Sequence, residues 1–200
     1  MNKHTKTAIL ISLVFGILLL LISWWLGKEN AFLVLNINGG AIADYFFRYW
    51  THTGDGIVWV FVVLMVLFFR RKQILLIFSA IIISTLLAQL SKNIFFKGTP
   101  RPSLAIPDNS LFHKVPGVEL HTLNSFPSGH TTTAFTIFLL ATLLIQRKWV
   151  VPIGFCYAAL AGYSRIYLAQ HFPIDVAAGI LAAIITVLLS WQIQLKWGKN

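Results

Sequence analysis

Three short clusters of polar residues interrupt an otherwise apolar chain, and their side chains suit chemistry on a phosphate group. The first cluster runs from Lys92 to Pro102 and the second is Phe126-Pro127-Ser128-Gly129-His130. The third runs from Ser164 to Asp175. Because polar side chains are costly near a membrane, their grouping indicates a function. The sequence predicts that the three clusters converge in one site.

The first cluster supplies cations. Arg101 lies between Pro100 and Pro102, and Lys92 and Lys97 precede it. An arginine guanidinium can bind two phosphate oxygens at once, and a lysine adds a point charge. The same residues could instead anchor a helix end at the membrane interface. We therefore expect either a phosphate clamp or an interfacial anchor here.

The second cluster is typical of a helix N-terminus. Ser128 is a favourable N-cap, and Gly129 allows a ligand to approach the backbone closely. Unpaired N–H groups of a first helical turn bind anions. His130 follows in that turn and can exchange a proton near neutral pH. The alternative is a plain Ser-Gly helix start with a histidine at the membrane interface.

The third cluster places Asp175 four residues after His171, and Pro173 predicts that a helix begins between them. A carboxylate there can accept the imidazole N–H, fix the tautomer and make the other nitrogen a better nucleophile. Arg165 lies in an otherwise uncharged stretch and needs an anionic partner. The alternative is a structural ion pair between Arg165 and Asp175.

Together the clusters contain the parts needed for covalent phosphoryl transfer. One histidine would attack phosphorus and the other would protonate the leaving oxygen, while cations and helix N–H groups stabilise the transferring group. The residues alone do not decide whether His130 or His171 attacks phosphorus and which of them protonates the leaving oxygen. We expect no metal and no cofactor, although these histidines and Asp175 could also bind zinc in a zinc hydrolase.

At this point the sequence resembles the type 2 phosphatidic acid phosphatase superfamily, which also includes vanadium haloperoxidases. Pro127–His130 matches the second of the three family signatures. The third signature is matched by Ser164-Arg165, five residues, His171, three residues and Asp175. The resemblance covers the chain from the first cluster to the third.

The first signature matches less well. The family pattern is a lysine, six residues and then Arg-Pro, whereas the position seven before Arg101 is Ile94. The nearest lysines are Lys92 and Lys97. We choose Lys92 as the phosphate-binding lysine, with two additional residues before Arg101, and keep Lys97 as the alternative.

The resemblance implies a function for each matched residue. His171 would be the nucleophile that becomes phosphohistidine, Asp175 would orient it, and His130 would be the general acid. The residues that would bind the phosphate oxygens are Lys92, Arg101, Ser128, Gly129 and Arg165.

The implied protein is an integral membrane phosphatase for a lipid monoester or diphosphate. Its substrate would be of the undecaprenyl diphosphate, phosphatidylglycerophosphate, phosphatidic acid or lipid A type. The loop 103–126 would border the site, with His113 and His121 as loop residues more than catalysts. The alternatives are a haloperoxidase that uses the same pocket and a non-catalytic protein that binds lipid phosphate.

The elements that must position these clusters are membrane helices. Of the 200 residues, 57% are apolar and 11% are charged, whereas a soluble domain is about 25% charged. This composition excludes a disordered chain and argues against an ordinary soluble protein. The single cysteine, Cys156, excludes an intramolecular disulfide. Six apolar segments span residues 8–26, 57–69, 73–90, 131–145, 150–170 and 174–195.

We therefore expect an all-α, polytopic membrane protein with six transmembrane helices in a bundle. One domain would cover residues 1–200, with the first span and an interfacial segment in 1–56 and the catalytic motifs in 91–175. The segment 8–26 is too long for a signal peptide and is expected to be retained. The segment 57–69 would reach only about 20 Å as a helix and needs neighbouring residues to cross.

The charges predict which way the bundle faces. With six spans and the N-terminus inside, the inner side carries +9 and the outer side +1, which sum to the net charge of +10. Basic residues favour the cytoplasmic side. We expect a plasma-membrane protein with both termini cytoplasmic and the active site at the outer, periplasmic or extracellular face. No nucleic-acid partner is expected, and the sequence predicts no oligomeric state. The nine inner basic residues are Lys3, Lys6, Arg70, Arg71, Lys72, Arg147, Lys148, Lys196 and Lys199.

Overall fold

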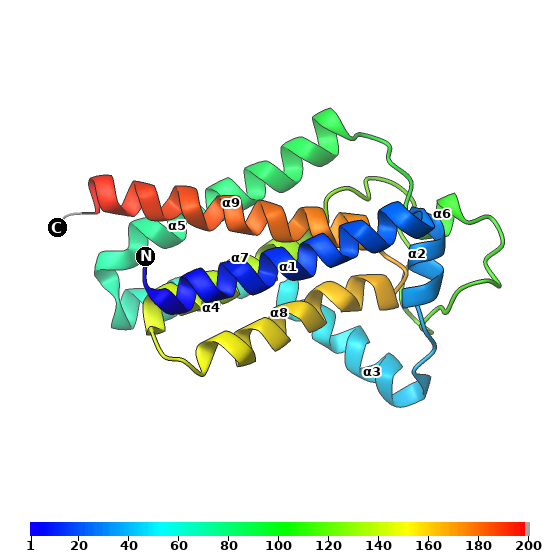
Figure 1. Ribbon diagram of the computed structural model, residues 1–200, viewed down its shortest axis with the longest axis horizontal. Coiled ribbons are helices and arrows are strands. Elements are labelled where there is room, and N and C mark those ends of the chain that lie inside the picture. Colours follow the sequence, from blue (N-terminus) through cyan, green and yellow to red (C-terminus); the bar gives the residue numbers. More distant parts are fainter. Residues whose placement is uncertain (199–200) are drawn as a thin grey trace.

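The computed structural model describes residues 1–198, and this part of the chain consists of helices joined by turns and loops (Figure 1). The all-α expectation is therefore confirmed for these residues. The α-helices are α1 (Lys3–Leu26), α2 (Lys28–Leu35), α3 (Gly40–Trp50), α4 (Val58–Phe69), α5 (Ile74–Leu90), α6 (Pro102–Ala105), α7 (Gly129–Ile145), α8 (Val150–Tyr167) and α9 (Pro173–Trp197). Three shorter helical turns are η1 (Thr51–Gly54), η2 (Arg71–Gln73) and η3 (Ser91–Phe95).

The long helices run side by side in a bundle (Figure 1). Helix α7 packs against α8, α9, α1 and α5, and α9 also packs against α5 and α1. Phe135, Phe138 and Leu139 of α7 are fully or almost fully buried in the core. Helices α7 and α9, which begin with the second and third clusters, are thus the best-packed elements of the fold.

Small residues allow the helices that carry the clusters to approach closely. A Cβ atom added at Gly179 of α9 would lie 2.7 Å from the Ser128 carbonyl oxygen. A Cβ atom added at Gly154 of α8 would lie 2.4 Å from the ring of Phe138. Such contacts are typical of packed membrane helices. The absence of a side chain at Gly179 therefore allows the first turns of α9 to pack closely against the start of α7.

Three helical segments are long and apolar enough to cross a membrane, namely Lys3–Leu26, Arg71–Phe95 and Pro173–Trp197. The pair Gly40–Gly54 and Val58–Phe69 is bent by 54° and would make a fourth span if it is counted as one. Helix α7 is apolar but has only 17 residues. Each of the six predicted segments does contain a long helix or most of one. Length and composition support a membrane protein with three or four spans among the described residues.

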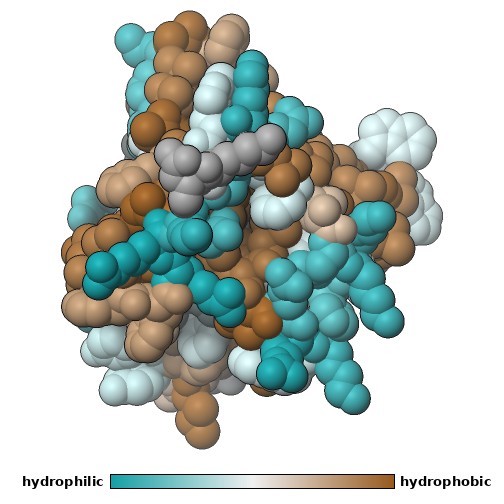
Figure 2. Space-filling view, turned by 90° about the vertical axis from the view of Figure 1, so that its left-hand side faces the viewer, coloured by the Kyte–Doolittle hydropathy of each residue, from teal (hydrophilic) through white to brown (hydrophobic). Residues whose placement is uncertain are grey.

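The two ends of the bundle differ in charge. The start of α1, the end of α9 and the α4–α5 and α7–α8 connections lie at one end (Figure 1). Figure 2 shows hydrophilic side chains across this end, with hydrophobic side chains beside them. Lys199 lies outside the described residues. The other basic residues predicted for the inner side are all exposed: Lys3, Lys6, Arg70, Arg71, Lys72, Arg147, Lys148 and Lys196.

The opposite end carries α2, α3, α6 and the loop 103–126 (Figure 1). Helix α3 exposes Ile42, which is 88% accessible, and buries Phe47 against Tyr163 and Tyr167 of α8. Asn36 donates hydrogen bonds of 2.9 Å to the carbonyl oxygens at the end of α8. The predicted interfacial segment therefore braces the loop that contains His171.

Candidate active site

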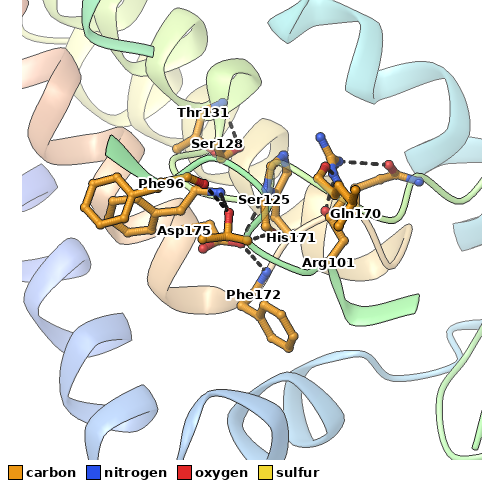
Figure 3. Close-up of polar contacts among 12 residues, drawn as sticks. Phe96, Arg101, Ser125, Ser128, Thr131, Gln170, His171, Phe172 and Asp175 are labelled. Atoms are coloured by element: carbon orange, nitrogen blue, oxygen red, sulfur yellow. Dashed lines mark hydrogen bonds and ion pairs between the residues drawn. The ribbon is translucent and has the colours of Figure 1, made fainter. Parts of the chain in front are cut away.

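The three polar clusters meet at this second end of the bundle. Figure 3 shows Arg101, His171 and Asp175 next to one another, with Ser128 at the start of α7 beside them. They come from three separate parts of the chain, because Arg101 precedes α6, Ser128 precedes α7, and His171 and Asp175 belong to the junction between α8 and α9. The predicted convergence of the clusters is thus what the structure shows.

His171 is held in a tight turn after α8. The backbone N–H groups of Gln170 and His171 both donate to the carbonyl oxygen of Arg165, at 2.9 and 3.1 Å. Ala169 adopts a left-handed conformation, with φ of 53°, to make this turn. The His171 side chain is only 1% exposed. Its imidazole is therefore fixed in position and largely excluded from water.

The surroundings of His171 keep its imidazole neutral. Burial, and then the nearby cations Arg101, Arg165 and Lys92, lower the pKa of His171 well below its usual range. A neutral imidazole has a free lone pair on one nitrogen. At neutral pH, His171 is therefore in the form that a nucleophile requires.

Asp175 lies beside His171 but does not bond to it in this structure. The expected hydrogen bond is not formed, because Asp175 Oδ2 is 3.4 Å from His171 Nδ1, and that nitrogen has no partner among residues 1–198. Oδ2 already accepts bonds from the Phe172 N–H, at 2.9 Å, and from Ser125 Oγ. Through the first of these bonds the Asp175 side chain accepts from the N–H of Phe172, the N-cap residue of α9. A small movement of the carboxylate is needed for Asp175 to orient His171.

Sequence reasoning did not find Ser125. This buried serine directly precedes the second cluster and donates to a carboxylate 50 residues away. Serines are common in polar loops, and no local pattern marks this one. Only the convergence of the chain segments shows that it contacts the site.

Ser128 is the N-cap of α7, as predicted. Its Oγ accepts bonds from Thr131 N at 3.4 Å and from Thr131 Oγ1 at 2.8 Å. Its own N–H donates to the Asp175 carbonyl oxygen at 3.0 Å, which joins the starts of α7 and α9. The N–H groups of Gly129 and His130 come next and have no carbonyl partner within the helix. This helix start is therefore suited to bind an anion.

His130 has a partner that the sequence did not predict. Its Nε2 lies 2.6 Å from Oδ1 of Asp55, which is in the loop between η1 and α4. A single aspartate in a Gly-Asp-Gly loop carries no local signal of such a contact. The pair lines two cavities of about 420 and 390 Å³. His121 also lines the first of these cavities.

The two arginines are buried with few partners. Arg101 is 8% exposed, and it donates from Nε to the Leu123 carbonyl and from Nη1 to both the backbone and the side-chain oxygen of Gln170. Arg165 is 7% exposed and donates to Thr51 Oγ1. Its Nε is buried without a partner in the described part of the chain. No ion pair joins Arg165 to Asp175 within residues 1–198, so that alternative is wrong.

The structure distinguishes the two lysines of the first cluster. Lys92 is half-buried, and its Nζ is 3.8 Å from the place that a Cβ atom would occupy at Gly129. Lys97 is exposed. Lys92 belongs to the π-helical turn η3, which contains one residue more per turn than an α-helix. That turn accommodates part of the longer spacing between Lys92 and Arg101.

The geometry does not favour a zinc site. Among residues 1–198, no group of three or more histidine, cysteine or acidic side chains lies close enough together to hold a metal ion. His130 instead contacts Asp55, and His171 lies beside a different aspartate, Asp175.

Comparison with known proteins gives the family. Residues 73–199 match the model of the PAP2 superfamily. The chain is 30% identical over 191 residues to an undecaprenyl-diphosphatase of Sulfolobus acidocaldarius, across 91% of this chain and 88% of that protein. The chain belongs to the PAP2 superfamily. It is a membrane lipid phosphatase, as its motifs indicated.

Other PAP2 proteins are similar over most of their length. A lipid A 4'-phosphatase of Porphyromonas gingivalis is 28% identical, across 84% of this chain and 73% of that protein. The crystal structure of Aquifex aeolicus LpxE has a TM-score of 0.70 and 31% identity, and covers 80% of this chain and 92% of that one. A transmembrane PAP2 type phosphatidylglycerolphosphate phosphatase of Bacillus subtilis has the same fold, with a TM-score of 0.64, 22% identity and 98% of both chains covered.

Proposed function

We propose that this PAP2 phosphatase removes the terminal phosphate of a polyprenyl diphosphate through a phosphohistidine on His171. The observation that carries the mechanism is a buried, neutral imidazole surrounded by three cations and a helix N-terminus. The substrate class is supported by the undecaprenyl-diphosphatase that aligns with 91% of the chain. A lipid A phosphate is the second candidate, because a lipid A 4'-phosphatase also aligns with 84% of the chain.

In the first step, Nε2 of His171 attacks phosphorus. Nδ1 faces Asp175, so Nε2 is the nitrogen left for a substrate. The new N–P bond forms as the bond between phosphorus and the leaving oxygen breaks. His130 gives a proton to that oxygen, and the lipid leaves with its remaining phosphate. Asp175 accepts the Nδ1–H and stabilises the positive charge on the phosphorylated imidazole.

In the second step, water attacks the phosphohistidine. His130, now without its proton, takes one proton from the water as the oxygen bonds to phosphorus. The N–P bond breaks, and inorganic phosphate and neutral His171 are formed. His130 is again protonated, so the cycle is closed without a cofactor.

The cations stabilise the charge that develops on the transferring phosphoryl oxygens. We assign this to Lys92, Arg101 and Arg165, together with Ser128 and the N–H groups at Gly129 and His130. Among residues 1–198 the buried Nε of Arg165 has no hydrogen-bond partner, which supports the assignment because buried donors normally have one. A phosphate oxygen would supply it.

We further propose that all six long helices cross the membrane and that the site faces outward. The basic residues predicted for the inner side are exposed in the described part of the chain, and the helix ends and connections that carry them lie at the end of the bundle opposite to the site (Figure 1). The positive-inside rule then puts both termini in the cytoplasm of a plasma-membrane protein. The substrate would reach the site with its tail still in the outer leaflet.

Phosphate release from a panel of lipids tests the proposal. Purified protein is given undecaprenyl diphosphate, lipid A, phosphatidylglycerophosphate and phosphatidic acid in mixed micelles. We expect the highest kcat/KM for the diphosphate, and no release by His171→Ala. Binding of these lipids without phosphate release would contradict an enzymatic function. A higher kcat/KM for lipid A than for the diphosphate would make a lipid A phosphate the substrate class in place of a polyprenyl diphosphate.

A further inference from the structure

Asp55 lies outside the three clusters, yet it contacts the proposed general acid. Its Oδ1 is 2.6 Å from His130 Nε2, and its Oδ2 is 2.8 Å from His52 Nδ1. The His52 side chain is 65% exposed and that of Asp55 is 32% exposed. A chain of three polar groups therefore leads from solvent to His130.

The backbone around Asp55 is built to make this contact. A Cβ atom added at the preceding residue, Gly54, would lie 2.9 Å from the His130 carbonyl oxygen and 3.0 Å from the His130 Cβ. Only a glycine allows the turn to lie so close to the start of α7. Tyr157 of α8 donates to the Thr53 carbonyl oxygen at 2.8 Å, which holds the same turn from another side. The position of Asp55 is thus fixed by two helices.

The contact determines which nitrogen of His130 is free. Nε2 is occupied by Asp55, whereas Nδ1 has no hydrogen-bond partner among the described residues. Burial first, and then Arg165 and Lys92, oppose the protonation of His130, whereas Asp55 favours it. Without an anion at this place, a histidine near two cations would be poorly protonated when a leaving group needs a proton.

We propose that Asp55 is a positioning residue for the general acid. Its carboxylate binds the Nε2–H of His130, fixes the ring, and makes Nδ1 the nitrogen that exchanges a proton with the leaving oxygen. The role rests on the proposed function of His130. The two cavities support it, because the Asp55–His130 pair borders both and can be reached from the side of Lys92 and from that of Arg165.

The test uses a leaving group that needs no proton. Asp55→Asn keeps the size of the side chain and removes its charge. We expect kcat on an alkyl lipid phosphate to fall at least tenfold, and kcat on 4-nitrophenyl phosphate to fall less than about threefold, because nitrophenolate leaves without a proton. Inhibition by vanadate should be unchanged. Asp55→Glu should restore part of the activity on the alkyl substrate.

Asp44→Asn is a matched control. Asp44 also pairs with a histidine, His113, at 2.7 Å, and neither residue lines the two cavities that the Asp55–His130 pair borders. This variant is expected to leave the ratio of the two activities unchanged. A similar change of the ratio in both variants would show that the readout reflects general structural damage.

Two outcomes would overturn the proposal. Equal loss on both substrates, together with weaker vanadate inhibition, would mean that Asp55 organises the phosphate site. Full activity on both would mean that the pair has no role in turnover. Failure of the underlying function looks different, since His130→Ala would then show no dependence on the leaving group, or the wild type would release no phosphate.

Discussion

Replacement of Lys92 by methionine tests which lysine of the first cluster binds the phosphate. The substitution keeps most of the aliphatic stem and removes the charge, so packing in η3 is largely preserved. Lys92 is half-buried, and its Nζ is close to Gly129 at the start of α7. A phosphate bound at that helix start would lie within reach of the ammonium group.

The expected magnitude follows from this position. A hydrogen bond to a charged group contributes about 1.5–3 kcal/mol, and about 1.4 kcal/mol corresponds to a factor of ten in kcat/KM. Lys92→Met should therefore lower kcat/KM by roughly 10- to 150-fold. Lys97 is exposed, and interactions of exposed charges contribute about 0–1 kcal/mol. Lys97→Met should reduce kcat/KM by no more than about fivefold.

The assay is phosphate release from a lipid phosphate at low substrate concentration, with both variants purified in the same detergent. Elution as a single species by size exclusion shows that each variant is folded. Lys92→Arg keeps the charge and should recover part of the activity. A larger loss in Lys97→Met than in Lys92→Met would refute the assignment and transfer the function to Lys97.

Four other predictions concern the mechanism and the topology. His171→Ala should abolish both turnover and the phosphoenzyme that is trapped from labelled substrate at alkaline pH; a stable phosphoenzyme in this variant would place the nucleophile elsewhere. Ser125→Ala removes one bond to Asp175 and should lower kcat about fivefold with little change in KM, for a loss of about 1 kcal/mol; an unchanged kcat would show that this bond is not needed. Vanadate should inhibit because it resembles the five-coordinate phosphoryl group; complete inhibition by a chelator, reversed by Zn²⁺, would instead indicate a metal enzyme. A cysteine in loop 103–126, in a Cys156→Ser background, should react with an impermeant thiol reagent in intact cells; reaction only after permeabilisation would mean the opposite orientation.

Local signals in the sequence predicted the elements well. Ser128 predicted the start of α7, and Pro173 predicted the start of α9. Both predictions succeed because N-cap residues and first-turn prolines act on the backbone within a few residues. The apolar segments predicted the long helices, because a run of apolar residues is also a local property of the sequence. The number of membrane crossings was less certain, since α4 has only 12 residues and its bent partner, α3 with η1, is not apolar throughout.

Contacts between distant segments could not be predicted in this way. The bonds that Asp55 makes to His130 and that Ser125 makes to Asp175 depend on how whole helices pack. The spacing of His171 and Asp175 correctly predicted that they are neighbours. It could not show that the Phe172 N–H, at the N-cap of α9, would already bind the carboxylate oxygen that faces the imidazole. The Asp175 carboxylate has two competing functions, to bind the Phe172 N–H and to orient His171, and only the three-dimensional structure shows this.

Phosphate binding would change the hydrogen bonds around Asp175 and the buried atoms near it. Within residues 1–198, Arg165 Nε and His171 Nδ1 are both buried without a hydrogen-bond partner. An unsatisfied buried polar group costs about 1–3 kcal/mol. A bound phosphate would satisfy the arginine directly, and phosphorylation of His171 would put a positive charge beside Asp175, which favours a direct bond to Nδ1. The free enzyme thus keeps donors unsatisfied that the phosphoryl group can satisfy, so binding energy is directed to the reacting centre.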